Sequence, residues 1–382
     1  MSHHTPPLGR AVVDLAAVSA NVRALRRHVH PSRLMAVVKA DAYGHGLVPV
    51  ALTALDAGAD QLGAATLSEG FALRAAGITS PVMVWLTSPA EDYARAAKEQ
   101  IELGVHTLEQ LTAAAAGGRA AGRPLVVHLK IETGMWRGGA TREQWPAISA
   151  MARAEEQSGA IRVRGIYTHL ARADEPGAPT TVAQLHELQA AREQAVSCGL
   201  NPEVVHAANS AAALATPQAH LDMVRAGIAI YGLNPVLGVS PPVSLRPAMA
   251  LEATLIGCKS APASVGVSYG HTHVTHDETY LGLVPLGYAD GIPRNASSNG
   301  DVLVAGRRHP IVGRICMDQF VVDLDRTPPD GLPDVVLFGP GSRGEPTAEE
   351  WARRTGTIHY EIVSRIGARV PRIYRRPGAR GG

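Results

Sequence analysis

Lys39 is the residue of this sequence best placed to act as a nucleophile. It ends a short apolar run, residues 34–38, and the glycine-containing segment 40–46 follows at once. The run predicts a buried β-strand and the segment a tight loop, so the lysine would lie at the carboxyl end of the strand. A partly buried lysine has a lowered pKa and can form a Schiff base with a carbonyl group. The alternative is a lysine whose stem packs on the strand end while its ammonium reaches water.

Further polar residues follow other predicted strands, where the carboxyl ends of the strands of one barrel would meet. They lie in the segments 130–137, 168–169, 208–210 and 225–228. Taken singly, each has a structural interpretation: Arg137 as a surface cation, His169 as a core histidine, Ser210 as a helix N-cap and Gly227 as a turn glycine. Their joint position at the strand ends favours a functional site.

The chemistry of these residues is mutually compatible. The backbone N–H groups of Gly227 and Ile228 and the N-cap hydroxyl of Ser210 could bind a phosphate at the start of a helix, where the helix dipole favours an anion. A phosphate site together with a Schiff-base lysine indicates pyridoxal phosphate.

The composition excludes several classes of protein. The chain has 382 residues, of which 46% are hydrophobic and 18% charged, so we expect a globular, water-soluble protein with two domains. The formal net charge of +2 is spread along the chain and gives no basic surface for nucleic acid or membrane lipid. No signal peptide or membrane-spanning run is present, which predicts a cytoplasmic protein. Three cysteines far apart predict neither a disulfide framework nor a zinc site.

The first two thirds of the sequence alternates apolar runs with Ala- and Leu-rich segments. The strand candidates are residues 34–39, 61–65, 82–86, 101–105, 125–131, 163–168, 204–207 and 222–224. The helix candidates include residues 47–58, 67–77, 107–122 and 182–199, several of which end at a glycine. Eight strand-then-helix repeats predict an α/β fold of the (β/α)8 TIM-barrel type, whose active site gathers at the carboxyl ends of the strands.

A second, mostly β domain is predicted after the barrel. Residues 237–243 resemble a linker, and the strand-like runs that follow are 249–258, 279–286, 301–305, 309–315 and 320–324. We therefore expect a flexible tail at residues 1–10, a cofactor-binding barrel at 11–240 and a β domain at 241–382. The early run 11–15 precedes the barrel pattern, so it either belongs to the barrel or pairs with the sheet of the β domain.

The motifs along the chain resemble those of bacterial alanine racemases, which are pyridoxal phosphate enzymes of fold type III. Residues 36–46 (AVVKADAYGHG) resemble their cofactor-lysine motif. The other matching segments are 130–137 (KIETGMWR), 206–212 (HAANSAA), 222–232 (DMVRAGIAIYG), 267–270 (VSYG), 287–291 (GYADG), 313–318 (GRICMD) and 357–361 (TIHYE). The resemblance covers nearly the whole chain. Related decarboxylases carry a similar lysine strand, whereas the motifs that contain Tyr269 and Met317 are much more specific to racemases.

The resemblance implies a two-base interconversion of L-alanine and D-alanine that supplies D-alanine for peptidoglycan synthesis. Lys39 would hold the cofactor and act as the base on one face of the substrate Cα, and Tyr269 from the other subunit of a homodimer would act on the opposite face. A free phenol has a pKa near 10, so Tyr269 needs help to lose its proton at neutral pH. By the resemblance, His169 and Arg225 provide that help, because the cationic end of the chain favours the phenolate.

The resemblance also implies the residues that bind cofactor and substrate. Arg225 would contact the pyridine nitrogen, and because arginine only donates hydrogen bonds, that nitrogen should stay largely unprotonated. Arg137 would bind the cofactor's phenolic oxygen and the substrate carboxylate. Met317 of the partner subunit would donate its backbone N–H to that carboxylate, and Tyr288 of the partner subunit would narrow the entrance, which suits alanine. The remaining cofactor residues implied are Tyr43, Ser210, Gly227, Ile228 and Tyr360 at the phosphate, with Asn209 beside them.

The sequence departs from the family pattern near Arg137. The usual motif has an aspartate, an asparagine and often a leucine where Glu132, Trp136 and Gly138 stand. In many relatives the counterpart of Lys130 is carbamylated and orients the arginine, so Lys130 is a candidate for carbamylation. Trp136 would alter substrate breadth or the fit of inhibitors near the site.

Four alternative functions stay open at this point. A broad-specificity or serine racemase would share every motif. A pyridoxal phosphate amino-acid decarboxylase would share the barrel and the lysine but has no use for Tyr269, and a non-catalytic pyridoxal-phosphate-binding protein would usually be the barrel alone. A metalloenzyme would use His271, His273 and His276, although no carboxylate or cysteine completes that group.

Overall fold

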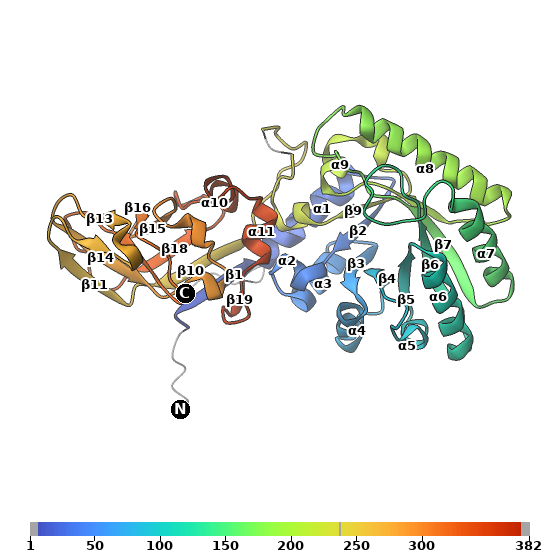
Figure 1. Cartoon of the computed structure of the whole chain (residues 1–382), viewed down its shortest axis with the longest axis horizontal. Coiled ribbons are helices and arrows are strands. Elements are labelled where there is room, and N and C mark those ends of the chain that lie inside the picture. Colours follow the sequence, from blue (N-terminus) through green and yellow to red (C-terminus); the bar gives the residue numbers. More distant parts are fainter. Residues whose placement is uncertain (1–6, 237, 376–382) are drawn as a thin grey trace. The chain divides into compact units, whose positions relative to one another are not determined.

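The computed structural model describes residues 7–236 and 238–375, which form two compact units (Figure 1). The barrel unit consists of residues 18–42 and 47–245. The β unit consists of residues 7–17, 43–46 and 246–375. The predicted fold class, a TIM-type barrel followed by a mostly β domain, is confirmed.

Eight parallel strands form the barrel. In spatial order they are β8 (Val204–His206), β7 (Ile161–Tyr167), β6 (Leu125–Lys130), β5 (Ile101–Val105), β4 (Val82–Leu86), β3 (Gln61–Thr66), β2 (Arg33–Val37) and β9 (Met223–Ala226). Backbone N–H groups of Asp222 and Arg225 donate to the carbonyl groups of Val205 and Ala208. These bonds connect the segment of β9 to that of β8, so the sheet closes into a barrel. Most residues of these strands are apolar, as expected when helices cover one face and a packed interior the other.

Helices lie around the outside of this sheet (Figure 1). They are α1 (Leu15–His28), α3 (Leu47–Asp56), α4 (Leu67–Ala75), α5 (Tyr93–Lys98), α6 (Leu108–Ala121), α7 (Trp145–Gln157), α8 (Pro179–Ser197) and α9 (Ser210–Ala215), with the short turns η1 (Pro217–Ala219) and η2 (Ile228–Tyr231). Thr66 and Thr107 cap the starts of α4 and α6 with their hydroxyl groups, and α6 ends on Gly122 with φ of 68°. These caps satisfy backbone groups that a helix end leaves unpaired.

The segment after β2 is a left-handed turn, where a tight loop is predicted. Ala40, Asp41 and Ala42 in α2 (Lys39–Tyr43) have φ of 53°, 51° and 53°. The turn is closed by a hydrogen bond from the Ala42 N–H to the Val38 carbonyl, 2.8 Å long. A left-handed residue other than glycine costs about 1–2 kcal/mol, so surrounding contacts must hold this turn directly behind Lys39.

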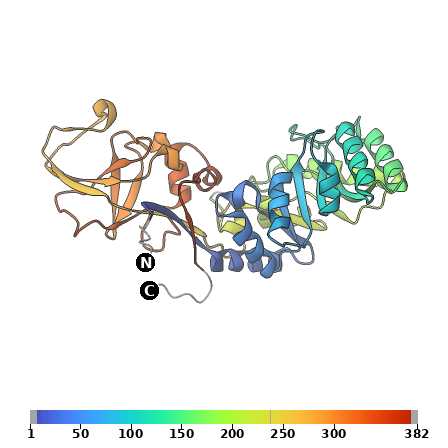
Figure 2. The ribbon, with the colours of Figure 1, turned by 90° about the horizontal axis from the view of Figure 1, so that it is seen from below.

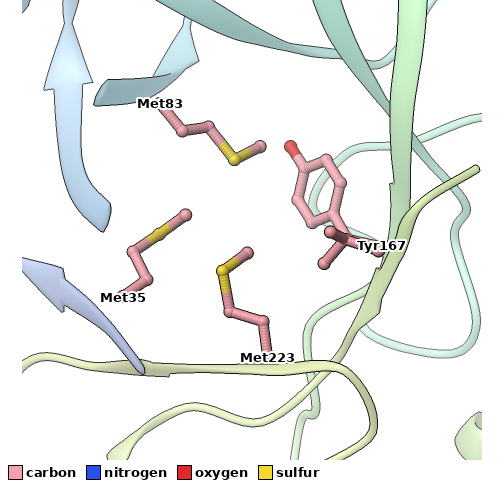
Figure 3. Packing of buried hydrophobic residues seen from close by; sticks show 5 residues of the cluster. Met35, Met83, Tyr167 and Met223 are labelled. Atoms are coloured by element: carbon pink, nitrogen blue, oxygen red, sulfur yellow. The ribbon is translucent and has the colours of Figure 1, made fainter. Parts of the chain in front are cut away.

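The interior of the barrel is filled by side chains, three of them methionines. Met35, Met83 and Met223 pack with Tyr167 and Val204 in one buried cluster, in which the three thioethers point toward one another and toward the tyrosine ring (Figure 3). A Cβ on Gly104 would lie 2.3 Å from the Tyr167 hydroxyl oxygen, so a glycine is needed there. The barrel is therefore a packed core that supports the residues at its strand ends.

The β unit is built on a nine-stranded sheet. Its spatial order is β11 (Gly257–Ala261), β14 (Thr279–Val284), β17 (Phe320–Asp323), β16 (Arg307–Val312), β15 (Asp301–Val304), β18 (Asp334–Phe338), β10 (Met249–Thr254), β1 (Gly9–Asp14) and β19 (Arg372–Arg375). Strand β1 pairs antiparallel with β10 and parallel with β19, and it is the blue strand beside the orange strands in Figure 2. Smaller elements are the hairpin of β12 (Gly266–Val267) and β13 (His273–Val274), the helices α10 (Ala348–Thr355) and α11 (His359–Ser364), and the turns η3 (Tyr269–His271), η4 (Tyr288–Asp290) and η5 (Arg294–Ala296).

None of the helices described is both long and apolar enough to cross a membrane.

Candidate active site

Glu69 holds the turn that follows Lys39. Its Oε1 accepts a hydrogen bond from the Ala40 N–H, 2.6 Å away, and its Oε2 accepts from the N–H groups of Ala65 and Thr66 at 2.8 Å and 3.3 Å. The same glutamate forms a capping box with Thr66 at the start of α4. Sequence reasoning missed this residue, although the Thr-x-x-Glu spacing of Thr66 and Glu69 was a signal for it.

Lys39 lies among cations at the end of β2. Part of its surface is exposed, yet the protein around it lowers the pKa of the ammonium, first by burial and then through the charges of Arg137 and Arg225, against which Glu69 acts. No described residue makes a hydrogen bond or an ion pair with the Lys39 ammonium or with the Arg137 guanidinium. Three cations with one nearby carboxylate form a place suited to an anionic ligand.

Arg225 is buried at the end of β9 and held on several sides. Its Nη2 donates to the carbonyl oxygens of Thr168 and Ala207, each 2.8 Å away, and its Nη1 lies 2.9 Å from His206 Nδ1. Burial lowers the pKa of Arg225 to about 10, which still leaves it a cation at neutral pH. The guanidinium is thus fixed in position and charge.

His169 is tied to Arg225. Its Nδ1 lies 3.2 Å from Arg225 Nη2. Because a guanidinium only donates, Nδ1 must accept, and the ring proton sits on Nε2. Burial, followed by the charges of Arg225 and Arg137, holds the pKa of His169 well below its ordinary value, so the ring is neutral. Its Nε2–H can therefore donate a hydrogen bond outward.

The loops after β8 and β9 are joined through Ser210. Its Oγ accepts hydrogen bonds from the N–H groups of Gly227 and Ala229, at 2.8 Å and 3.3 Å. The prediction that Ser210 is a helix N-cap is wrong: Asn209 has the extended backbone of a cap, and its side chain accepts from the N–H groups of Ala211 and Ala212. Among the described residues none accepts the proton of the Ser210 hydroxyl, which remains a donor at this place, and Ile228 begins η2 next to it.

The segment before Arg137 is a turn held by Glu132. Its Oε1 accepts from the N–H groups of Gly134 and Met135, 2.6 Å and 2.5 Å away. Trp136 follows with φ of 55° and 80% of its surface exposed. Arg137 is also exposed, and its charge acts on Lys39, His169 and Lys130.

Lys130 is the last residue of β6, two residues before Glu132. Its ammonium donates to the carbonyl oxygen of Gly138. Burial, with the charges of Arg137 and Arg225 against that of Glu132, lowers the pKa of Lys130 to about 8. The lysine is therefore partly neutral near pH 8, which is the state in which an amine reacts.

In the β unit, four expected site residues form two pairs. The rings of Tyr43 and Tyr360 lie 6.2 Å apart. Tyr288 and Met317 lie on adjoining segments, because the N–H groups of Tyr288 and Ala289 donate to the carbonyl groups of Cys316 and Met317 at 3.1 Å and 3.0 Å.

Tyr269 and its supporting residue also belong to the β unit. Tyr269 is exposed at the start of η3, directly after Ser268, which has φ of 60° and donates its hydroxyl to the Arg314 carbonyl at 2.6 Å. That bond anchors the turn from which the tyrosine projects. No group of three or more His, Cys, Asp and Glu residues suited to a metal ion occurs in the part of the chain that the structure describes, so the histidines after Tyr269 gain no support as a metal site.

Comparison with known proteins places the chain in a family. Residues 13–235 match the model of the alanine racemase N-terminal domain, and residues 248–374 match that of the C-terminal domain. The chain belongs to the alanine racemase family. The resemblance given by its motifs is thereby confirmed over both units.

Individual members of the alanine racemase family are similar over almost their whole length. The alanine racemase of Frankia casuarinae is 50% identical over 366 residues, covering 95% of this chain and 95% of its own. That of Streptomyces coelicolor is 50% identical over 372 residues, covering 96% and 95%. The crystal structure of alanine racemase from the D-cycloserine producer Streptomyces lavendulae superimposes with a TM-score of 0.94 at 47% identity, covering 99% of this chain and 98% of that one.

Proposed function

We propose that this chain is a pyridoxal-phosphate-dependent alanine racemase that interconverts L-alanine and D-alanine as a homodimer and supplies D-alanine for peptidoglycan. The observation that carries the proposal is the cation group at the carboxyl ends of the barrel strands, in which Lys39 and Arg137 lack a protein partner among the described residues and Arg225 is fixed beside them. Family membership supports the same activity.

The residues present fit the cofactor. Lys39 supplies an amine of lowered pKa for the cofactor aldehyde, and Arg225 supplies donors fixed by carbonyl groups for the ring nitrogen. The free hydroxyl proton of Ser210, with Gly227, Ile228, Asn209, Tyr43 and Tyr360, would hold the phosphate. When bound, pyridoxal phosphate withdraws electrons from the substrate Cα and makes its proton acidic.

Two bases on opposite faces of Cα would move that proton. One base returning its own proton to the same face would regenerate the starting enantiomer, so racemisation needs a second group. Lys39 would serve one face, because burial and the charges of Arg137 and Arg225 lower the pKa of its ammonium and so favour the neutral amine that accepts a proton. Tyr269 of the partner subunit would serve the other. His169, neutral and with its proton on Nε2, would donate to the phenolate oxygen and stabilise the deprotonated tyrosine.

The substrate would be held by its carboxylate. Arg137 offers a guanidinium without a competing carboxylate among the described residues, which suits bidentate binding of an α-carboxylate. Met317 of the partner subunit would add a backbone N–H. Tyr288 of the partner subunit would narrow the entrance and favour a small side chain such as the methyl group of alanine.

Lys130 would carry a carbamate that orients Arg137. A neutral amine adds carbon dioxide and releases one proton, and the pKa of about 8 makes the neutral form available. The product is an anion, which would replace a third cation near Arg137 and Arg225 by a counter-charge. This charge balance favours the modification at that position.

The proposal is tested by following alanine in heavy water. The purified protein is first checked by absorbance for a lysine Schiff base, and then L-alanine is followed for deuterium incorporation, chirality and carbon dioxide. We expect deuterated D-alanine without carbon dioxide. Release of carbon dioxide would replace the proposal by a decarboxylase, and a yellow protein that exchanges no proton would replace it by a binding protein. Serine in place of alanine measures substrate breadth in the same assay.

A further inference from the structure

A row of hydrogen-bonded side chains crosses the barrel from Arg225 to Glu102. Arg225 Nη1 lies 2.9 Å from His206 Nδ1, and His206 Nε2 lies 3.0 Å from His128 Nδ1. His128 Nε2 in turn lies 3.0 Å from Glu102 Oε2. All four residues are buried. Arg225 stands near the carboxyl end of β9, whereas Glu102 is the second residue of β5, so the row joins the active-site end of the barrel to its opposite end.

The two ends of the row determine where its protons lie. A guanidinium only donates and an ionised carboxylate only accepts. Each histidine must therefore carry its proton on Nε2 and present a lone pair at Nδ1, toward Arg225. Protonation of either ring would place two donors face to face. The opposite order, with a proton on His206 Nδ1, would conflict with Arg225.

Glu102 is held as the anion by its other partners. Arg164 Nη1 donates to Oε1, and Gln61 Nε2 donates to Oε2 at 2.8 Å. Burial acts to raise the pKa of Glu102, but the hydrogen bond from His128 and the charge of Arg164 outweigh it and keep the pKa below its ordinary value. At the other end, burial and the charge of Arg225 hold the pKa of His206 well below its ordinary value, so that ring is neutral.

The backbone of the barrel is shaped around this row. The register of β6 against β7 shifts between Val127 and His128, which pair with Val163 and Gly165, so Arg164 is an extra residue in a β-bulge. A Cβ on Gly165 would lie 2.3 Å from His128 Nδ1, so only glycine leaves room for that ring. A strand irregularity and a glycine thus both serve the contact between Glu102 and His128.

We propose that Glu102 is a positioning residue of the active site, which acts through His128 and His206 to hold the guanidinium of Arg225 in one orientation. The inference deepens the proposed function and rests on it, because Arg225 matters through the cofactor nitrogen that it would face. The two imidazoles transmit the order of the protons: reversal of that order would turn an N–H of His206 against Arg225 and push the guanidinium away.

Glu102→Gln tests this order, because a carboxamide has one accepting and one donating end. In one orientation the carboxamide oxygen of the Glu102→Gln side chain faces His128, and its NH2 group then faces the donor Arg164. In the other orientation the oxygen faces Arg164, and the NH2 group donates to His128, which moves the proton of each imidazole from Nε2 to Nδ1. Arg164→Met in the same protein removes the competing donor and should restore the original order. Glu203→Gln is the matched control, since Glu203 lies 3.8 Å from the same Arg164 but outside the row.

The measurement is the 15N spectrum of histidine-labelled protein, recorded with kcat and KM for alanine. In the unmodified protein we expect the proton of each ring on Nε2, because Arg225 can only donate at one end of the row and Glu102 accepts at the other. In Glu102→Gln we expect a population of His206 with its proton on Nδ1 and a kcat about tenfold lower, with KM changed less than about twofold. Addition of Arg164→Met should reverse both changes, and Glu203→Gln should cause neither.

A spectrum and kcat of Glu102→Gln equal to those of the unmodified protein would overturn the proposal. If that variant does not fold, the unmodified protein decides: Nε2–H on both rings supports the order, and Nδ1–H on either ring overturns it. A protein with the expected ring protons that does not racemise alanine would instead refute the proposed function, so the two failures are distinguishable.

Discussion

Glu69 accepts a hydrogen bond from the backbone N–H of Ala40, the residue after Lys39, at 2.6 Å. Both carboxylate oxygens accept from N–H groups, so Glu69→Gln would turn an NH2 against one of them. We expect a loss of about 0.5–1.5 kcal/mol in the free energy of unfolding, because one of these N–H groups loses its acceptor. We also expect a lower pKa of Lys39, since the Glu69 charge acts to raise it.

Chemical denaturation checks the stability, and the pH dependence of the rate at which the Lys39 amine reacts with pyridoxal phosphate checks its pKa. Glu109→Gln is the control, because Glu109 also lies in the first turn of a barrel helix but far from the turn behind Lys39 in sequence. Equal stability of the two variants would mean that the left-handed turn is held by other contacts.

Lys130 should take up carbon dioxide in a pH-dependent manner. Its pKa of about 8 means that the neutral fraction grows almost tenfold per pH unit up to that value and levels off above it. At a fixed concentration of dissolved carbon dioxide we therefore expect carbamate occupancy to rise from about pH 6.5 to about pH 8.5. A 13C signal from labelled carbon dioxide, lost in Lys130→Met and kept in Lys259→Met, measures it. A signal unaffected by Lys130→Met would place the carbamate elsewhere or nowhere.

Sharing of active sites between subunits can be tested with two inactive variants. Lys39→Ala and Tyr269→Phe each remove one base from every site of their own dimer. In a mixed dimer, one of the two sites keeps both bases. Random co-assembly makes half of the dimers mixed, so we expect about a quarter of the unmodified activity. Co-expression, with each variant alone as control, measures this recovery, and a folded mixture with no activity would speak against a shared site.

Arg369 supports the segment that carries Tyr288. It donates from Nε and Nη2 to the two oxygens of Asp290 at 3.0 Å each, and Asp290 accepts from the Gly287 N–H at 2.9 Å. Arg369→Met would loosen this support, and we expect KM for alanine to rise about threefold to tenfold with little change in stability. Steady-state kinetics beside Arg326→Met, whose arginine pairs with the exposed Asp277, provide the comparison. Equal KM values in the two variants would contradict the prediction.

Trp136 stands in a left-handed conformation that asparagine adopts more readily than tryptophan. We expect Trp136→Asn to keep or slightly raise stability, because asparagine is enriched at positive φ. If the exposed indole limits substrate breadth next to Arg137, the variant should change the ratio of kcat/KM for serine to that for alanine. An unchanged ratio would show that the tryptophan has no part in selecting the substrate.

The barrel was predictable because each of its strands is a short apolar run followed by a helical segment. The β unit was less so. β18 is an apolar run that was not predicted as a strand. β19 has the sequence Arg-Ile-Tyr-Arg and carries no apolar pattern. The predicted strand at 249–258 is two strands, β10 and β11, because the chain turns after Thr254. In the β unit, the local pattern therefore failed to identify one central strand and one edge strand.

The ends of the barrel strands were found from sequence, but their support was not. An apolar run precedes each of four polar residues, which made them predictable as residues at strand ends: Lys39, Arg137, His169 and Arg225. Glu102 and His128 lie within such runs, and their contact joins residues 26 positions apart on different strands. In the sequence, a single polar residue within an apolar strand gives no sign of a function. Only the barrel geometry shows that polar side chains from several strands contact one another.

The pairing of β1 with both β10 and β19 sets the order in which the two units can fold. Residues 18–245 hold every strand of the barrel, which can complete its core while later residues are still being synthesised. The large sheet forms later, because residues 9–14 can pair only after residues 249–254, and then residues 372–375, have left the ribosome. During that interval the first strand has an unpaired apolar edge that can pair with wrong partners, so misfolding of the nascent chain is most readily initiated at this short segment.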